Sequence, residues 1–131
     1  MSVTASGDAA RDLRRVVLLV EDEDAVRRSL QLFLTGRGYH VRAYSAAATL
    51  LADKSLDGAG LLVADYRLPD SSGIRLLTTM RQRGWRGRAI LMTGHGCEEL
   101  EGLAREAGFE TLMGKPLRHQ QLLSALEGGE R

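Results

Sequence analysis

The chain has 131 residues, of which 18 are lysine or arginine and 17 are aspartate or glutamate. This length is typical of one compact domain, and the net charge of +1 argues against a general nucleic-acid binder or an acidic tail. The longest apolar run covers only residues 16–20, whereas a membrane helix needs about 20 residues. The first fifteen residues contain no apolar segment typical of a signal peptide. The single cysteine, Cys97, cannot form an internal disulfide, so we expect a reducing compartment and a cytoplasmic protein. Because the sequence has no apolar segment of membrane-spanning length, we expect no membrane association.

The hydrophobic pattern predicts strands and helices that alternate along the chain. Residues 1–14 are small and polar, so we expect a flexible tail before one domain over residues 15–131. Short apolar runs predict strands at residues 16–20, 40–44, 61–64, 88–92 and 110–113. Apolar residues at helical spacing predict helices at residues 26–34, 46–54, 74–84, 99–107 and 122–126. Ser45 is the expected N-cap of the second helix.

Five strands, each followed by a helix, predict an α/β fold with a parallel sheet covered by helices on both faces. Connections between parallel strands need about a dozen residues, and the predicted helices supply them. In such doubly wound folds, ligands bind outside the carboxyl ends of the strands. The residues directly after each predicted strand are therefore the first candidates for function.

Acidic and polar side chains follow four of the predicted strands: Glu21 and Asp22 the first, Asp65 the third, Thr93 the fourth and Lys115 the fifth. Two like charges about 4 Å apart repel by roughly 4 kcal/mol at an effective dielectric constant of about 20. Converging carboxylates therefore indicate a bound cation. Oxygen donors without histidine or cysteine favour a hard cation, and Mg²⁺ fits best. Acidic residues after a strand often only cap the next helix, but four compatible strand ends favour a functional site.

Four segments of the chain resemble the response-regulator receiver domains of two-component signalling, of the chemotaxis-regulator type. They are V-L-L-V-E-D-E-D, L-L-V-A-D-Y-R-L-P-D-S-S-G, I-L-M-T-G-H and M-G-K-P-L. Each alone is weakly specific, but all four in this order are specific, and the resemblance covers residues 15–127. It implies a flavodoxin-like (βα)5 fold whose parallel sheet has the order 2-1-3-4-5, for which this family is itself a known example.

The resemblance implies a role for each acidic residue after a strand. Asp65 would be the nucleophile that takes a phosphoryl group from a phosphohistidine donor and forms an acyl phosphate. Asp22 and Asp65 would bind Mg²⁺ directly, Glu21 would bind it through water, and the backbone carbonyl of Arg67 would complete the protein's ligands. Glu21 replaces the aspartate that is common in the family, and we expect it to keep the water-mediated contact.

The resemblance also implies roles for the polar residues after the last two strands. Lys115 would pair with the phosphoryl oxygens, and Thr93 would move its hydroxyl onto one of them. Pro116 makes a cis Lys-Pro bond a natural expectation. Such a domain is no enzyme in the usual sense, because it promotes only its own phosphorylation and dephosphorylation. Its expected partners are a sensor histidine kinase or a histidine phosphotransfer protein, and a downstream protein target.

The sequence departs from the family at the residues that tune the signal. Leu112 stands where the family commonly has phenylalanine or tyrosine, so either the output face is altered or leucine is an ordinary aliphatic replacement. Arg67 and His95 follow Asp65 and Thr93 by two residues, and their size predicts a long-lived phosphoryl group unless both project into solvent. A homodimer, if one forms, is expected to use the face of helix 99–107, strand 110–113 and the last helix.

The sequence argues against several other functions. A haloacid-dehalogenase-type phosphatase needs a second aspartate where Arg67 stands, and an FMN site would be repelled by the acidic residues after the first strand. Arginines around Trp85 could suggest nucleic acid, but we expect a solvated helix end there and no direct nucleic-acid binding. The remaining alternative is a non-phosphorylated pseudo-receiver that acts as an interaction module.

The output of such a domain is expected to lie outside this sequence. Five residues follow Leu126, which leaves no room for a DNA-binding or catalytic effector after the last helix. Met1 and the polar lead suggest a natural start, which favours a stand-alone receiver or an amino-terminal one over a fragment of a hybrid kinase.

Overall fold

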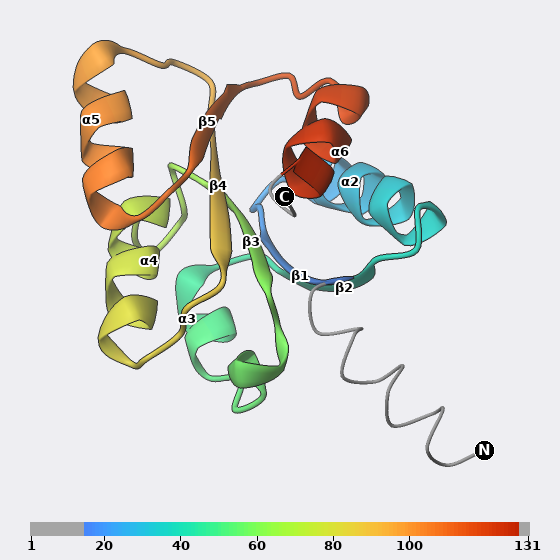
Figure 1. The fold of residues 1–131 in the computed structure, drawn as a ribbon, viewed down its shortest axis with the longest axis horizontal. Coiled ribbons are helices and arrows are strands. Elements are labelled where there is room, and N and C mark those ends of the chain that lie inside the picture. Colours follow the sequence, from blue (N-terminus) through green and yellow to red (C-terminus); the bar gives the residue numbers. More distant parts are fainter. Residues whose placement is uncertain (1–14, 129–131) are drawn as a thin grey trace.

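The computed structural model describes residues 15–128 and contains a five-stranded parallel sheet between two layers of helices (Figure 1). The strands are β1 (Val16–Val20), β2 (His40–Tyr44), β3 (Leu61–Asp65), β4 (Arg88–Thr93) and β5 (Thr111–Gly114). The helices are α2 (Asp24–Gly36), α3 (Ala47–Leu51), α4 (Gly73–Gln82), α5 (Glu98–Ala107) and α6 (His119–Gly128), with a 3-10 turn at Leu56–Gly58. The predicted tail at residues 1–14 and the last three residues of the predicted domain lie outside the described residues.

The predicted fold class is confirmed. The strands are all parallel and lie in the order β2-β1-β3-β4-β5. Each predicted strand is present with ends within one residue of the prediction, whereas α3 is shorter than the predicted helix 46–54. Within residues 15–128, no helix is long and apolar enough to cross a membrane.

Alternation of side chains along the strands builds one hydrophobic core on each face of the sheet. On one face, Leu18 and Leu62 pack against α3, α4 and α5; on the other, Leu19 and Val63 pack against α2 and α6. Both faces of β1 and β3 are fully buried, which explains their continuous apolar sequences. β2 lies at one edge of the sheet and is only half-buried, in line with its weak alternation.

The amino-terminal end of α3 differs from the prediction. Ser45 was expected to cap this helix, but the N-cap is Ala46, whose side chain has no acceptor. The cap comes instead from Asp70 in the loop between β3 and α4. Its two carboxylate oxygens accept hydrogen bonds of 3.0 Å from the Ala47 N–H and 2.9 Å from the Ala48 N–H. The loop that follows β3 is thereby tied to α3.

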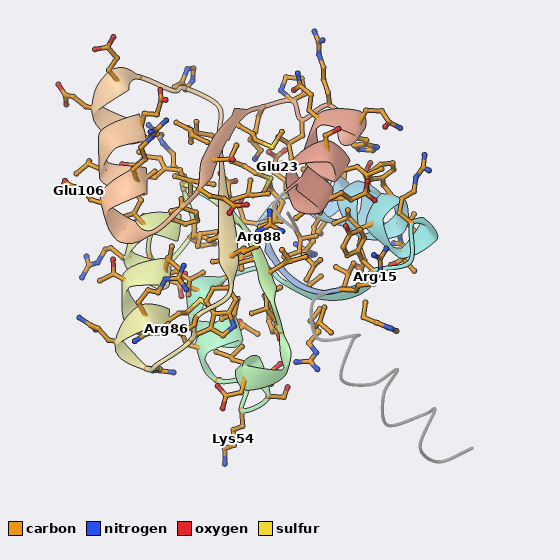
Figure 2. The ribbon with its side chains drawn as sticks, viewed as in Figure 1. Arg15, Glu23, Lys54, Arg86, Arg88 and Glu106 are labelled. Atoms are coloured by element: carbon orange, nitrogen blue, oxygen red, sulfur yellow. The ribbon has the colours of Figure 1, made fainter. Side chains whose placement is uncertain are left out.

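The arginines around Trp85 lie at the amino edge of the sheet, where they donate to backbone carbonyls. Arg83 and Arg86 are exposed, as expected for a solvated helix end, whereas Arg81 and Arg88 are half-buried. Trp85 is buried, and its indole N–H donates to the Ala59 carbonyl over 2.9 Å. Arg88 pairs with Glu110 and also donates to two carbonyls at the end of α6. Figure 2 shows Lys54 and Arg86 at this end of the molecule, opposite the end that carries Glu23.

Candidate functional site

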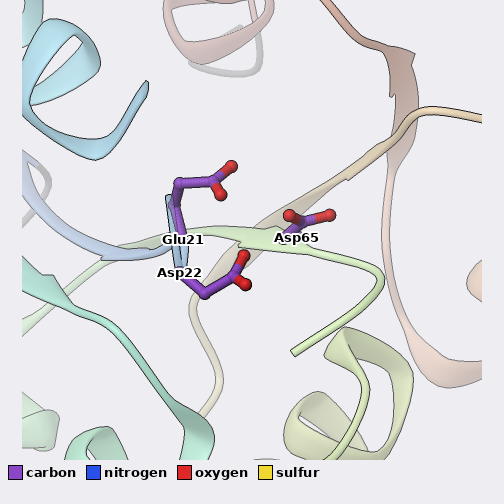
Figure 3. Close-up of side chains that lie close together, drawn as sticks. All are labelled: Glu21, Asp22 and Asp65. Atoms are coloured by element: carbon purple, nitrogen blue, oxygen red, sulfur yellow. The ribbon is translucent and has the colours of Figure 1, made fainter. Parts of the chain in front are cut away.

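Three carboxylates converge at the carboxyl ends of β1 and β3 (Figure 3). Val20 pairs with Ala64 in the sheet, so the residues that follow these two strands emerge side by side. One oxygen each of Glu21, Asp22 and Asp65 lies within 4.8 Å of the other two. Glu21 is fully buried and Asp65 is 6% exposed, whereas Asp22 faces solvent. The predicted acidic cluster is therefore present, and it opens to solvent on the Asp22 side.

Lys115, directly after β5, places its ammonium group among these carboxylates. Its Nζ lies 2.8 Å from Oδ2 of Asp65, 2.7 Å from Oε1 of Glu21 and 3.9 Å from Oε1 of Glu23. The side chain is 18% exposed, so these contacts are only partly screened by water. The bond from Lys115 to Pro116 is cis, as the sequence led us to expect.

Burial and neighbouring charges shift the pKa values of Glu21 and Lys115. Desolvation by burial raises the pKa of Glu21, and the neighbouring Asp65 charge adds to the rise against the opposing contact with Lys115. Burial opposes the charge of Lys115, but the contacts with Asp65 and Glu21 outweigh it and raise the pKa of the lysine. Oε1 of the buried Glu21 lies against the lysine ammonium, and Oε2 accepts the backbone N–H of Glu23 over 3.0 Å. The site therefore holds more negative charge than its single ammonium neutralises.

The set of oxygen donors fits a hard divalent cation. All three clustered groups are carboxylates, and the described residues provide no histidine or cysteine in this cluster. The acidic cluster thus fits the metal site of a receiver domain.

The other predicted site residues line a cavity of about 730 Å³ above the acidic cluster. Thr93 and Arg67 both contribute to its wall, together with Asp65 and Lys115. Thr93 is buried, and its hydroxyl oxygen accepts a 3.2 Å hydrogen bond from the backbone N–H of His95. Arg67 lies in the loop after β3, where its backbone bridges to Ser72. The structure therefore brings all the predicted side chains to one edge, with Thr93 and Arg67 facing the cavity rather than contacting the carboxylates.

Two charged residues near the cluster were missed by the sequence analysis. Glu23, two residues after Glu21, lies within ion-pair distance of Lys115. Arg27 lies on α2, and its guanidinium turns back to the loop after β1 and donates to the Glu21 carbonyl over 2.8 Å. The one signal in the sequence was the spacing of Asp24 and Arg27, which form an ion pair over 2.6 Å.

Leu112, at the position where the family commonly has an aromatic ring, lies half-buried beside the loop that follows Thr93. It packs against the hydrophobic core on the α3, α4 and α5 side of the sheet. A Cβ atom placed on Gly96 would lie 3.6 Å from the Thr93 methyl group and 3.9 Å from a methyl group of Leu112. The leucine thus already packs inward near the threonine.

The sheet order and the acidic cluster with its lysine together define the receiver class of signalling domains. The chain belongs to this family: the profile of the response regulator receiver domain matches residues 17–127. Receiver domains are signalling phosphoacceptors of two-component systems, rather than classical enzymes, and they partner with histidine kinases.

Curated relatives agree with this assignment. The transcriptional regulatory protein FixJ of Rhizobium meliloti (strain 1021) is 34% identical over 111 residues, which cover 85% of this chain and 54% of the relative. Nodulation protein W of Bradyrhizobium diazoefficiens is 32% identical over 120 residues, covering 92% of this chain and 53% of that protein. The chain therefore spans about half the length of these relatives.

Solved structures show the same fold. A CheY-like response regulator receiver domain protein from Methanospirillum hungatei JF-1 superposes with a TM-score of 0.79 at 26% identity, covering 88% of this chain and 92% of that one. The structure titled FixJ-N superposes with a TM-score of 0.75 at 33% identity, covering 86% of this chain and 90% of that one.

Proposed function

We propose that this chain is the phosphoacceptor of a two-component phosphorelay. Asp65 takes a phosphoryl group from a sensor histidine kinase or a histidine phosphotransfer protein in a Mg²⁺-dependent reaction, and the change is relayed by protein–protein contacts. The observation that carries the proposal is the position of Asp65, between two further carboxylates and the ammonium group of Lys115. An aspartate that served only to cap a helix would need none of these neighbours.

We propose the metal ligands that the resemblance to receiver domains implies, and the acidic cluster supports three of them. Asp22 and Asp65 bind Mg²⁺ directly, Glu21 binds through water, and the backbone carbonyl of Arg67 completes the protein's share. When bound, the metal neutralises and orients phosphoryl oxygens. The exposed position of Asp22 leaves a route for the cation from solvent. A nearby cation opposes the rise in the Glu21 pKa that burial causes.

Asp65, Lys115 and Thr93 have separate roles in the proposed transfer. A carboxylate oxygen of Asp65 attacks the phosphorus of the phosphohistidine. A P–O bond forms, giving an acyl phosphate, while the P–N bond breaks and its electron pair leaves with the imidazole, which takes up a proton from solvent. Lys115 exchanges its contact with Asp65 for one with a phosphoryl oxygen, and Thr93 donates its hydroxyl hydrogen to another.

We further propose how the phosphorylated state is kept and transmitted. Arg67 and His95 are both exposed and both line the cavity above Asp65, where they can hinder the approach of water to the acyl phosphate. Leu112 has no ring that could move between exposed and buried positions, so the signal depends on the loop between Thr93 and α5. A homodimer, if one forms, uses the face of α5, β5 and α6, and the protein works in the cytoplasm.

Intact mass spectrometry after incubation with acetyl phosphate and Mg²⁺ tests the proposal. We expect one phosphoryl adduct on the wild type, none on Asp65→Asn and none when the metal is chelated. Asp57→Asn is the matched control, because this exposed aspartate lies in the 3-10 turn away from the cluster, and it should keep the adduct. A wild type without an adduct would leave the chain as a non-phosphorylated interaction module. An adduct that survives Asp65→Asn would place the phosphoryl group on another residue and would contradict the proposed role of Asp65.

A further inference from the structure

The loop between β1 and α2 carries two of the three clustered carboxylates. One side chain of α2 donates hydrogen bonds to the backbone of this loop. Arg27 Nη1 donates to the carbonyl of Glu21 over 2.8 Å and lies 3.5 Å from the carbonyl of Asp22. Its Nη2 pairs with Oδ1 of Asp24 at 2.6 Å. One guanidinium group therefore contacts two residues of the loop and the first residue of α2.

These contacts hold the backbone of the loop. The carbonyl oxygens of Glu21 and Asp22 both lie within hydrogen-bond distance of Arg27 Nη1. Within the loop, the backbone N–H of Glu23 donates to Oε2 of Glu21 over 3.0 Å. The loop is thus held both from α2 and by its own side chain, and a guanidinium suits this task because its donors are fixed in one plane.

The charge of Arg27 acts in the same direction. The cluster contains three carboxylates, and Lys115 is the cation that reaches it from the cavity side. Arg27 adds a second positive charge beside the loop, and its side chain is only 22% exposed. Without it, repulsion between Glu21 and Asp22 would favour an opening of the loop.

We infer that Arg27 is a positioning residue for the metal site: by holding the backbone carbonyls of Glu21 and Asp22, it keeps the carboxylates of these two residues aimed at the cation. The inference rests on the proposed function, because it assumes that this site binds Mg²⁺. Groups that orient metal ligands without touching the metal commonly change metal affinity by about 10- to 100-fold. Arg28, the next residue, is exposed and offers a matched control.

The test compares Arg27→Met, Arg27→Lys and Arg28→Met with the wild type, using titration calorimetry with MgCl2. Arg27→Met should weaken Mg²⁺ binding about tenfold, and Arg28→Met should bind like the wild type. Arg27→Lys should recover part of the affinity, because an ammonium can reach a carbonyl but lacks the planar fork. In the metal-free protein, the backbone amides of residues 21–24 should exchange faster in Arg27→Met only.

Phosphorylation by acetyl phosphate provides the second measurement. Adduct formation in Arg27→Met should be slow at limiting Mg²⁺ and should return to the wild-type rate at saturating Mg²⁺. Equal affinities in Arg27→Met and Arg28→Met, or a slow rate that saturating metal does not restore, would overturn the inference. If Arg27→Met fails to fold by circular dichroism, a wild-type affinity in Arg27→Lys would overturn it as well. A wild type that binds no Mg²⁺ would instead contradict the proposed function.

Discussion

Lys115 and Asp65 lie 50 positions apart in the chain, yet Nζ of the lysine is 2.8 Å from Oδ2 of the aspartate. The same ammonium group is 2.7 Å from the fully buried Glu21. A single ammonium group therefore pairs with two carboxylates. This arrangement makes the lysine important for stability as well as for the proposed transfer, and the two effects can be measured separately.

Replacement of Lys115 by methionine should destabilise the fold at neutral pH. The variant leaves Glu21 and Asp65 without their shared counter-charge, and we expect a loss of about 2 kcal/mol in the free energy of unfolding. Because the contacts raise the pKa of Lys115, its stabilising effect is complete below the ordinary lysine value and is lost as the pH rises through the raised one. Urea unfolding should therefore show the two proteins converging at alkaline pH. A constant difference across that range would contradict this prediction.

The hydrogen bond from the Tyr44 hydroxyl to Asp53 should make stability depend on pH at both extremes. Burial raises the pKa of Tyr44 to about 12, and hydrogen bonds from Ser55 and Tyr44 lower that of Asp53 to about 2. The tyrosine contribution is complete below pH 10 and is lost between pH 10 and about 12. The aspartate contribution is present above pH 3.8 and is lost as the pH falls toward about 2.

Tyr44→Phe tests this pair. At pH 7 the variant should be less stable by about 1 to 2 kcal/mol, because a hydrogen bond to a charged acceptor is lost. The alkaline loss seen in the wild type between pH 10 and about 12 should be reduced in the variant. Thermal unfolding across the pH range measures both effects, and an unchanged alkaline profile would show that another group titrates there.

Two glycines should respond in opposite directions to alanine. A Cβ atom on Gly73 would lie 2.6 Å from the carbonyl oxygen of Asp65 and 2.7 Å from a methyl group of Leu91, so Gly73→Ala should destabilise by about 2 kcal/mol. Gly102 lies in α5 with open space around it, so Gly102→Ala should stabilise by roughly 0.5 to 1 kcal/mol. Chemical denaturation distinguishes the two, and a stabilising Gly73→Ala would mean that the loop after β3 can shift freely.

Removal of the Asp70 carboxylate should loosen α3. In Asp70→Asn, the backbone amides of Ala47 and Ala48 lose a charged acceptor, and their hydrogen exchange should accelerate. These same two hydrogen bonds lower the pKa of Asp70, so the wild type should show the change only as the pH falls below the ordinary aspartate range. Asp57→Asn, which removes an exposed carboxylate elsewhere, should leave the two amides unchanged. Equal exchange in both variants would show that α3 does not depend on this cap.

Truncation of the two large side chains at the cavity should shorten the life of the phosphoryl group. In the double variant Arg67→Ala, His95→Ala, water should reach the proposed acyl phosphate more easily, and hydrolysis should be faster than in the wild type. The decay of the adduct, followed by intact mass after removal of acetyl phosphate, measures this rate. Unchanged hydrolysis would indicate that both side chains project into solvent, as their exposure permits.

The sheet and the centre of the site followed from the sequence because both depend on local pattern and strand direction. In a parallel sheet the residues after the strands must meet at one edge, and this rule alone brought Glu21, Asp65 and Lys115 together. The strand order came from the resemblance to receiver domains rather than from periodicity. The predicted order was correct because the four motifs together identify the receiver family, and the strand order belongs to the fold of that family.

The contacts that support the site could not be read from the sequence in the same way. Asp70 caps a helix 22 to 23 positions earlier in the chain, and the path of the loop after β3 decides whether it can reach. Arg27 follows the helical pattern of an outward residue, and only the turn of the preceding loop brings carbonyl oxygens within its range. Side chains that bond to backbone carbonyls carry no periodic signal, because any residue supplies the acceptor.

The chain has one tryptophan, Trp85, and it is buried before β4 with Arg81 stacked 5.2 Å from its ring. Asp65 is the last residue of β3, so the indole ring and the proposed phosphoacceptor lie at opposite ends of the parallel strands. Intrinsic fluorescence should therefore report the loss of the folded state and stay nearly silent when a cation or a phosphoryl group arrives. Trp85 is thus an intrinsic fluorescent probe of unfolding that does not respond to the reaction at Asp65. Fluorescence can therefore measure stability in a sample whose phosphorylation is followed by mass.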